Sequence, residues 1–214
     1  MNERNETMTS RKHRGFSLLE LMITVSIAMI LMGATFITLR PILYRGHVDS
    51  AYDKTLMVLR NTRHLAITQS HEYVVTLNAA AGTIQVQYQP PAVGGIFPPL
   101  QAVNNYSLPV DVSFAVQGGF PAAAPDSFGT GVTAVDFGYG PPGPQGGQNT
   151  IVFMPDGSSR DINTGGNYNS GVVYLTRPGD TIYSSRAITV WGATGRVRGW
   201  RLIQQAGAPI WTQQ

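Results

Sequence analysis

The chain has 214 residues, no cysteine, and 15 basic against 12 acidic side chains, so its formal net charge at pH 7 is +3. The absence of cysteine excludes disulfides and metal sites with thiolate ligands, so any folded domain must be held together by core packing. The length leaves room for one domain of ordinary size besides a terminal segment.

The excess of positive charge lies mainly at the N-terminus. Residues 1–15 contain four basic and two acidic side chains, a net charge of +2, and the rest of the chain contains 11 basic and 10 acidic side chains, a net charge of +1. A basic balance and a pI near 9.3 can indicate a nucleic-acid partner. Because the excess precedes an apolar segment, a targeting signal is the better interpretation, and the positive-inside rule predicts a cytoplasmic N-terminus.

A long apolar stretch follows this basic segment. It runs 24 residues from Phe16 to Leu39 and contains one charged side chain, Glu20. As a helix rising about 1.5 Å per residue it would be about 36 Å long, enough to cross a hydrocarbon core about 30 Å thick. A carboxylate at mid-membrane costs roughly 2.5–3.5 kcal/mol on insertion scales. The sequence therefore predicts a transmembrane helix over residues 16–40 in which Glu20 has a partner.

The junction between the basic segment and the apolar stretch resembles a known signal. Its sequence, RKHRG followed by FSLLELMITV, is similar to the class III signal of type IV pilins and type II secretion pseudopilins: a basic leader, a glycine, an aromatic residue, and a glutamate five positions past the glycine. The resemblance implies that a membrane-embedded prepilin peptidase removes the leader 1–15 by cutting after Gly15 and methylates the new amine of Phe16. It also implies a single-pass inner-membrane protein with a periplasmic C-terminal domain, whose helix later packs with other pilins or pseudopilins in a filament.

The residue types at this junction suit that processing. Gly15 has no side chain, which fits a crowded peptidase site and an extended scissile backbone. Cleavage leaves an α-amine with an ordinary pKa near ~8 on Phe16. Glu20, one helical turn away, can neutralise this amine or that of the subunit ahead in a filament, and methylation keeps the positive charge. Glu20 is therefore the predicted assembly contact; the alternative is an ordinary signal anchor in which the glutamate is accidental.

A second, amphipathic helix is predicted over residues 41–71. Pro41 predicts a kink or break after the apolar stretch. From Ile42 to Ser70 apolar residues recur at spacings of three and four, which gives one apolar stripe suited to packing against a sheet. Three of the four histidines lie on this segment, and no carboxylate cluster joins them, so solvated side chains are a better interpretation than a metal site.

The remaining residues, 72–214, are predicted to form a β-rich domain. Two runs, EYVVTL at 72–77 and TIQVQYQ at 83–89, predict a half-buried antiparallel hairpin. Segments rich in proline and glycine at 90–107 and 117–149 predict long loops.

Two strand-like runs interrupt or adjoin these loops. LPVDVSFAV at 108–116 alternates strictly, and residues 132–137 form a shorter apolar run. Further strands are predicted at residues 150–154, 159–162, 171–176, 186–191 and 196–203. The segment PDGS at 155–158 predicts a tight turn, and GATG at 192–195 joins the last two strands as a hairpin.

This C-terminal pattern carries a second resemblance. The phrases IVFMPDGSS, GVVYL and ITVWGATGRVR are together similar to the globular domain of GspH/FimT minor pilins and pseudopilins. The resemblance implies an α+β fold in which a long N-terminal helix packs on an antiparallel β-sheet or sandwich. It also implies a minor pilin or pseudopilin that assembles into a type IV pilus or a type II secretion pseudopilus.

A cluster of arginines near the C-terminus supports an alternative function. The four side chains have no acidic residue among them: Arg186, Arg196, Arg198 and Arg201. On a strand, Arg196 and Arg198 project from the same face, and nearby tryptophans could stack on bases. In competence-associated members of the resembled family, such a basic end implies DNA capture. The alternative is that these arginines only solvate the outer face of a sheet.

No enzyme is predicted. The sequence contains no GxSxG motif, no glycine-rich phosphate loop with its lysine, and no paired carboxylates around a plausible pocket. Asp156 and Asp161 lack the regular spacing of oxygen ligands that a Ca²⁺ loop needs, so turn-forming aspartates are the better interpretation. No cofactor and no metal are expected.

Overall fold

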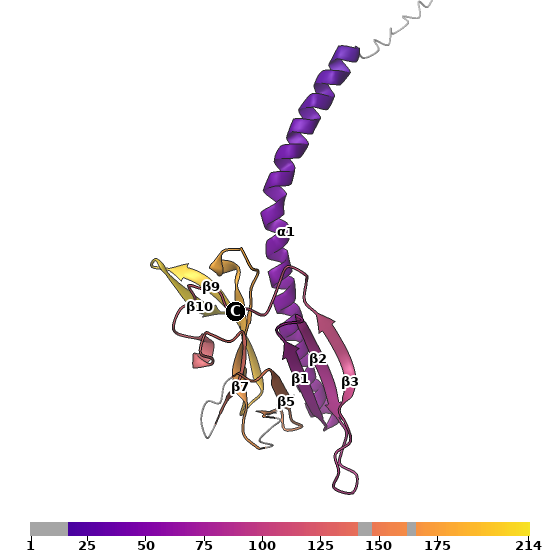
Figure 1. The fold of residues 1–214 in the computed structure, drawn as a ribbon, viewed down its shortest axis with the longest axis vertical. Coiled ribbons are helices and arrows are strands. Elements are labelled where there is room, and N and C mark those ends of the chain that lie inside the picture. Colours follow the sequence, from indigo (N-terminus) through magenta and orange to yellow (C-terminus); the bar gives the residue numbers. More distant parts are fainter. Residues whose placement is uncertain (1–16, 141–146, 162–165) are drawn as a thin grey trace, which may run out of the picture. The chain divides into compact units, whose positions relative to one another are not determined.

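The computed structural model describes residues 17–140, 147–161 and 166–214 and, for residues 36–45, the backbone alone. The chain divides into two compact units, the first ending at Leu43 and the second beginning at Tyr44. Helix α1, Leu18–Gln69, contributes residues to both units (Figure 1).

The first unit is the apolar part of α1. Its window Leu18–Thr35 is long and apolar enough to cross a membrane, and none of it is buried within this chain. Hydroxyl groups in the window donate to carbonyls of their own helix, Thr24 Oγ1 to Leu21 O at 2.9 Å and Ser26 Oγ to Met22 O at 2.8 Å. These bonds satisfy the hydroxyl hydrogens internally, which a lipid environment requires.

The helical backbone continues through Pro41, where the sequence predicted a kink or break, so no end of the helix lies there. A proline inside a helix removes one backbone hydrogen bond and crowds the preceding turn. That local loss does not end a helix that has long helical segments on both sides.

The second unit contains two five-stranded antiparallel sheets, with strand orders β3-β2-β1-β5-β6 and β10-β9-β8-β7-β4. The first sheet consists of β1 Glu72–Asn78, β2 Thr83–Gln89, β3 Gln101–Ser107, β5 Thr150–Phe153 and β6 Ser159–Arg160. The second consists of β4 Val135–Tyr139, β7 Ser170–Leu175, β8 Arg186–Trp191, β9 Arg196–Gln205 and β10 Ala208–Gln213. Two short 3-10 helices, η1 Pro125–Ser127 and η2 Ile182–Ser184, lie in connections. The predicted α+β class is confirmed.

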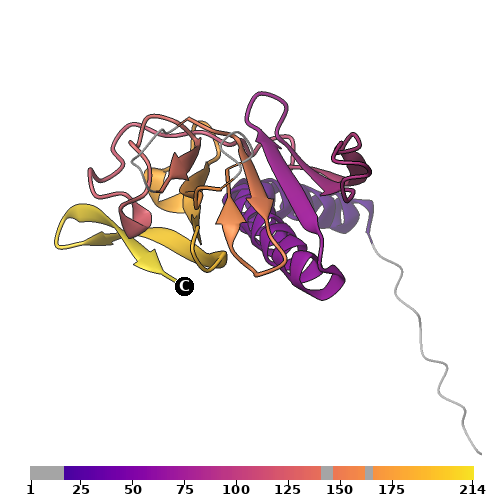
Figure 2. The same cartoon turned by 90° about the horizontal axis from the view of Figure 1, so that it is seen from below.

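The amphipathic part of α1 lies along β1 and β2 of the first sheet in both ribbon views (Figures 1 and 2). Strands β9 and β10 belong to the second sheet. Its buried stripe consists of Val48, Ala51, Tyr52, Thr55, Val58, Leu59, Thr62 and Ala66. The hydroxyls of Thr55 and Thr62 donate to Ala51 O and Val58 O at 2.8 Å, so these two polar side chains are buried without an unmet donor.

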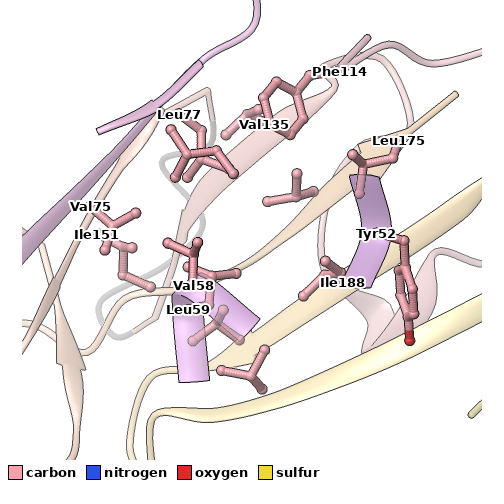
Figure 3. Close-up of a cluster of buried hydrophobic side chains, with 14 of the residues drawn as sticks. Tyr52, Val58, Leu59, Val75, Leu77, Phe114, Val135, Ile151, Leu175 and Ile188 are labelled. Carbon is pink, nitrogen blue, oxygen red and sulfur yellow. The ribbon is translucent and has the colours of Figure 1, made fainter. Parts of the chain in front are cut away.

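One core cluster joins this stripe to both sheets. Val58 and Leu59 lie close to Val75 and Ile151 of the first sheet and to Ile188 of the second (Figure 3). Complete burial of one such aliphatic side chain contributes roughly 1.5–3 kcal/mol. The helix is therefore the element on which both sheets pack. The sequence had predicted that its apolar stripe packs against one sheet.

The segment following the first hairpin differs from the prediction. Residues 90–107 were expected to form a loop, but they include strand β3, an edge strand whose residues are mostly exposed. The polar sequence QAVNNYS lacks a regular apolar alternation because most of this strand is exposed, although Tyr106 packs against the core.

Residues 108–116 were expected to form a strand and do not. Only an isolated bridge between Ser113 and Thr176 forms there. Pro109 begins a turn in which Val112 N donates to Pro109 O at 3.0 Å, and this turn leaves Val110 fully exposed. The apolar alternation instead directs Leu108, Val112 and Phe114 into the core from an irregular segment.

The second long loop agrees with the prediction at its strand-like run and differs from it elsewhere. Within residues 117–149, β4 forms close to the predicted run 132–137, and Phe120 and Phe128 pack with Val172 and Tyr174 on the face of the second sheet opposite α1. Residues 141–146 of the predicted exposed loop lie outside the described residues. Strand β10 was not predicted. It follows a two-residue turn in which Ala206 and Gly207 both have positive φ, and Ala-Gly is not one of the sequences that usually indicate such a turn.

A close approach of helix and sheet explains one glycine in the last hairpin. Gly199 of β9 is buried, and a Cβ atom added there would overlap the hydroxyl and ring of Tyr52 from α1. Tyr52 is itself 6% exposed, and burial raises the pKa of its phenol. The absence of a side chain at position 199 therefore sets how closely α1 and β9 pack.

We predict that Gly199→Ala lowers the free energy of unfolding of the second unit by about 1–3 kcal/mol, the usual cost of overpacking. The measurement is urea unfolding of the full chain in a non-ionic detergent. Gly46→Ala is a matched control, because an added Cβ there meets nothing within 4 Å, and it should be neutral or slightly stabilising. Equal stability of Gly199→Ala and the wild type would contradict the proposed contact.

Candidate functional site

The predicted N-terminal site lies partly outside the described residues, which begin after Gly15 and Phe16. Glu20 is exposed in the first turn of α1, where its charge interacts favourably with the helix dipole. Among the described residues, no cationic side chain lies within ion-pair distance of Glu20. A partner for this carboxylate must therefore lie outside the described side chains.

The helix surface near Glu20 is open for contact. Large apolar side chains from Leu18 to Met32 are exposed, and a Cβ added at Gly33 would meet nothing within 4 Å. Small residues allow the backbones of two helices in a membrane to approach closely. This surface has the composition of a helix that packs against other helices.

The four arginines of the predicted DNA site do not form one surface. Arg196 and Arg198 share a face of β9, as predicted, opposite Trp191 and Thr189 of β8. Arg201 pairs in register with Arg186 and lies on the opposite face, which is the face toward α1. The four arginines are close in sequence, but the alternation of side chains along the strands puts two of them on each face of the sheet.

Arg186 is buried and has an acidic partner on the helix. Its Nη2 lies 2.7 Å from Asp49 Oδ1, and its Nη1 donates to Ser184 O at 2.9 Å and Ser185 O at 3.1 Å. Burial lowers the pKa of Arg186, and the charge of Asp49 partly offsets this effect. The guanidinium therefore holds α1 to the start of β8.

Arg198 also has an acidic partner. Its Nη1 lies 2.8 Å from Asp126 Oδ1, and its guanidinium lies over the Trp191 ring, 5.4 Å from the centroid. Asp126 Oδ2 accepts from Thr189 Oγ1 at 2.6 Å and from Trp191 Nε1 at 2.9 Å. Asp126 adopts a left-handed φ of 52°, a conformation that its three side-chain contacts stabilise. These bonds fasten η1 to the second sheet.

Two polar networks in the second unit were not predicted. The buried carboxylate of Asp136 accepts from Gly147 N at 2.6 Å, Tyr139 Oη at 2.8 Å and Thr130 N at 3.0 Å. Burial and the hydrogen bond to Asp136 raise the pKa of Tyr139 to about 12. Asp136 occurs in an apolar run of the sequence, and only the fold brings its donors around it.

The second network joins α1 to the irregular segment after β3. His47 Nδ1 donates to Asp111 at 2.8 Å, and Arg177 Nε lies 3.1 Å from the other oxygen of Asp111. Burial raises the pKa of the Asp111 carboxyl, but the hydrogen bond from His47 and the charges of His47 and Arg177 outweigh it, so the pKa lies below its ordinary value of 3.8. His47 and Asp111 are 64 residues apart, so no local sequence pattern could have predicted their contact.

Neither network has the composition of a catalytic or metal centre. No group of three or more histidine, aspartate or glutamate side chains that could hold a metal ion occurs among the described residues. Asp156 and Asp161 do not share a site: Asp156 accepts from Ser158 in its turn, while Asp161 accepts from Gln148 Nε2 at 2.9 Å. The polar side chains here connect loops and strands.

Comparison with known proteins identifies the N-terminal segment. Residues 10–36 match the family model described as the prokaryotic N-terminal methylation motif. The match spans the predicted cleavage junction, Glu20 and the apolar window of α1. The chain therefore carries this methylation motif, as the resemblance of its N-terminal junction predicted.

Two solved structures are similar to the chain over much of its length. Both are of the minor pseudopilin EpsH from the type 2 secretion system of Vibrio cholerae, at 10% identity and a TM-score of 0.42. The likeness covers 72% and 73% of this chain and 94% of each EpsH chain. No curated protein is significantly similar in sequence.

The lowered pKa of Asp111 predicts how stability depends on pH. A carboxyl group with a folded pKa below its unfolded value stabilises the folded state at neutral pH, and the contribution is lost as pH falls through the folded pKa. In Asp111→Asn, unfolding free energy should be lower at pH 7 and should fall less steeply below about pH 4 than in the wild type. His47→Gln should lie between the two.

Urea unfolding of the full chain in detergent, repeated from pH 7 to pH 3, measures these differences. Parallel profiles for the wild type and Asp111→Asn over the acidic range would show that Asp111 is not linked to folding.

Proposed function

We propose that this chain is a minor pilin or pseudopilin of the GspH/FimT type, which assembles through its N-terminal helix into a type IV pilus or a type II secretion pseudopilus. The observation that carries the proposal is the apolar window Leu18–Thr35, none of which is buried in this chain, directly behind a methylation motif. So large an apolar surface must be covered either by lipid or by other helices.

Processing would come first. The basic leader retains the N-terminus in the cytoplasm, the apolar window spans the inner membrane, and the second unit lies in the periplasm. A prepilin peptidase then cuts after Gly15 and methylates Phe16. This gives a helix whose N-terminal amine is cationic and whose nearest acidic side chain is Glu20.

Assembly would follow by exchange of lipid for helices. Glu20 has no cationic partner among the described side chains, so an amine of a neighbouring subunit can neutralise it in a setting of low dielectric constant. The small side chain at Gly33 and the internally bonded hydroxyls of Thr24 and Ser26 allow close packing without unmet polar groups. The role is structural; it requires no catalytic group in this chain.

The second unit is suited to remain folded throughout this exchange. Among the residues whose side chains are described, the stripe that its sheets cover begins at Val48, and the window Leu18–Thr35 contributes nothing to the buried core. The resemblance of IVFMPDGSS, GVVYL and ITVWGATGRVR to the GspH/FimT domain supports a minor, rather than a major, subunit.

DNA capture through the C-terminal arginines is the less favoured function. Arg186 and Arg198 are paired with aspartates, and Arg196 and Arg201 lie on opposite faces of the sheet. Non-specific DNA binding needs a continuous row of cations along the backbone, and these four residues do not provide one.

We predict that Gly15→Leu leaves the leader attached, while Glu20→Ala is cut and methylated but absent from filaments. Mass spectrometry of the N-terminus reports processing, and the amount of the chain in sheared filaments, or cross-linked to other subunits, reports assembly. Thr24→Val, one turn further along the same helix, is the control and should behave as the wild type in both measurements. Normal assembly of Glu20→Ala would reject the charge contact, and a wild-type N-terminus other than methylated Phe16 would reject the processing.

A further inference from the structure

Three arginines from two separate parts of the sequence line one hollow on the second unit. Arg60 and Arg63 come from α1, and Arg196 comes from the start of β9; Thr194 and Val197 complete the lining of a hollow of about 430 Å³. Only Arg196 belonged to the cluster predicted from the sequence.

These arginines differ from most others of the unit in having no acidic partner. Arg160, Arg177, Arg186 and Arg198 each lie within ion-pair distance of an aspartate. Among the described residues, no carboxylate lies within that distance of Arg60, Arg63 or Arg196. The guanidinium groups of Arg60 and Arg63 lie at the hollow, and Arg196, whose side chain leaves β9 on the face away from α1, borders it at the start of the strand. A bound anion would offset this concentration of positive charge.

The hollow is preorganised by hydrogen bonds to backbone carbonyls. Arg63 Nε donates to Gly157 O at 3.0 Å and Thr194 O at 3.1 Å, and its Nη2 donates to Thr194 O at 2.9 Å. Arg60 Nη2 donates to Val197 O at 3.3 Å. The Nη1 groups of both arginines have no acceptor among the described residues. Side chains that are already fixed lose less entropy when a ligand binds.

Two glycines make room for this arrangement. A Cβ at Gly157 would lie 3.1 Å from Arg63 Nη2, and a Cβ at Gly195 would lie 2.9 Å from Arg63 Nε. Both residues have positive φ, 82° and 59°. The turns after β5 and β8 are therefore shaped around the guanidinium of Arg63.

The chemistry of the lining favours a carboxylate ligand on a protein. Guanidinium N–H groups form strong charge-assisted hydrogen bonds to carboxylates, and Val197 supplies an apolar surface against which an aliphatic stem can pack. Single-stranded nucleic acid would require stacking platforms, but no aromatic side chain lines the hollow. Trp191 and Trp200 instead donate their indole N–H groups to Asp126 and Thr189. Three cations also provide few of the contacts of a duplex-binding surface.

We propose that the hollow formed by Arg60, Arg63 and Arg196 docks a short acidic segment of a second protein. The proposal concerns the second unit alone and does not depend on cleavage at Gly15 or on the pairing of Glu20. It assigns to the globular unit a contact surface separate from the helix.

Binding of labelled peptides to the full chain in non-ionic detergent tests the proposal. The probes are a ten-residue peptide containing four consecutive aspartate and glutamate residues, the same peptide with asparagine and glutamine in their place, and a short DNA duplex. The acidic peptide should bind, more weakly as salt rises, and the neutral peptide should not.

The double variant Arg60→Gln/Arg196→Gln should bind the acidic peptide at least about tenfold more weakly, as expected for the loss of hydrogen bonds to a charged group. Arg63 is left unchanged because it fastens two turns. The matched control is Lys54→Gln/Arg201→Gln, which removes the same charge outside the hollow and should retain most of the affinity. Equal losses in the two double variants, no binding of the acidic peptide, or binding of the duplex alone would overturn the proposal.

Discussion

The amphipathic part of α1 is the element on which the folded unit depends. Its buried stripe packs on both five-stranded sheets, so residues from β1 and β5 and residues from β8 meet the same two helical turns around Val58 and Leu59. The helix and β9 approach so closely that Tyr52 occupies the space where any side chain at position 199 would lie. Ion pairs such as Arg186 with Asp49 then fix the orientation of this contact, but removal of apolar surface from water supplies the larger part of the stabilisation.

The same helix has opposite surroundings in the two units. From Val48 onward one face is covered by the chain itself, whereas the window Leu18–Thr35 has no cover within the chain. A folded unit that does not need the apolar window can keep its structure while the window exchanges lipid for other helices. This division of one helix into a buried and an uncovered part is the physical basis of the proposed movement from membrane to filament.

Arginine serves three different purposes in the second unit. Arg186 and Arg198 are neutralised by aspartates and connect α1 and η1 to the second sheet. Arg63 caps two turns through their carbonyls, and with Arg60 and Arg196 it leaves a positive hollow without an acidic partner among the described residues. The number of arginines therefore does not indicate where an anion binds. The positions of the aspartates decide which guanidinium groups are available to a ligand.

The sequence by itself determined the features that depend on local pattern: the methylation motif, the apolar window, the stripe of α1, and the strands with clear alternation or continuous apolar runs, such as β2, β7 and β8. It did not determine β3, β10 or the irregular course of residues 108–116. An exposed edge strand has no apolar face to reveal it, and the turn at Pro109 overrides the alternation around it. Only the tertiary structure decided which charges meet. The pleat of β9 separates Arg198 from Arg201, packing of α1 places Arg60 and Arg196 at one hollow, and folding joins His47 to Asp111 across 64 residues. These contacts link residues that no short sequence window contains.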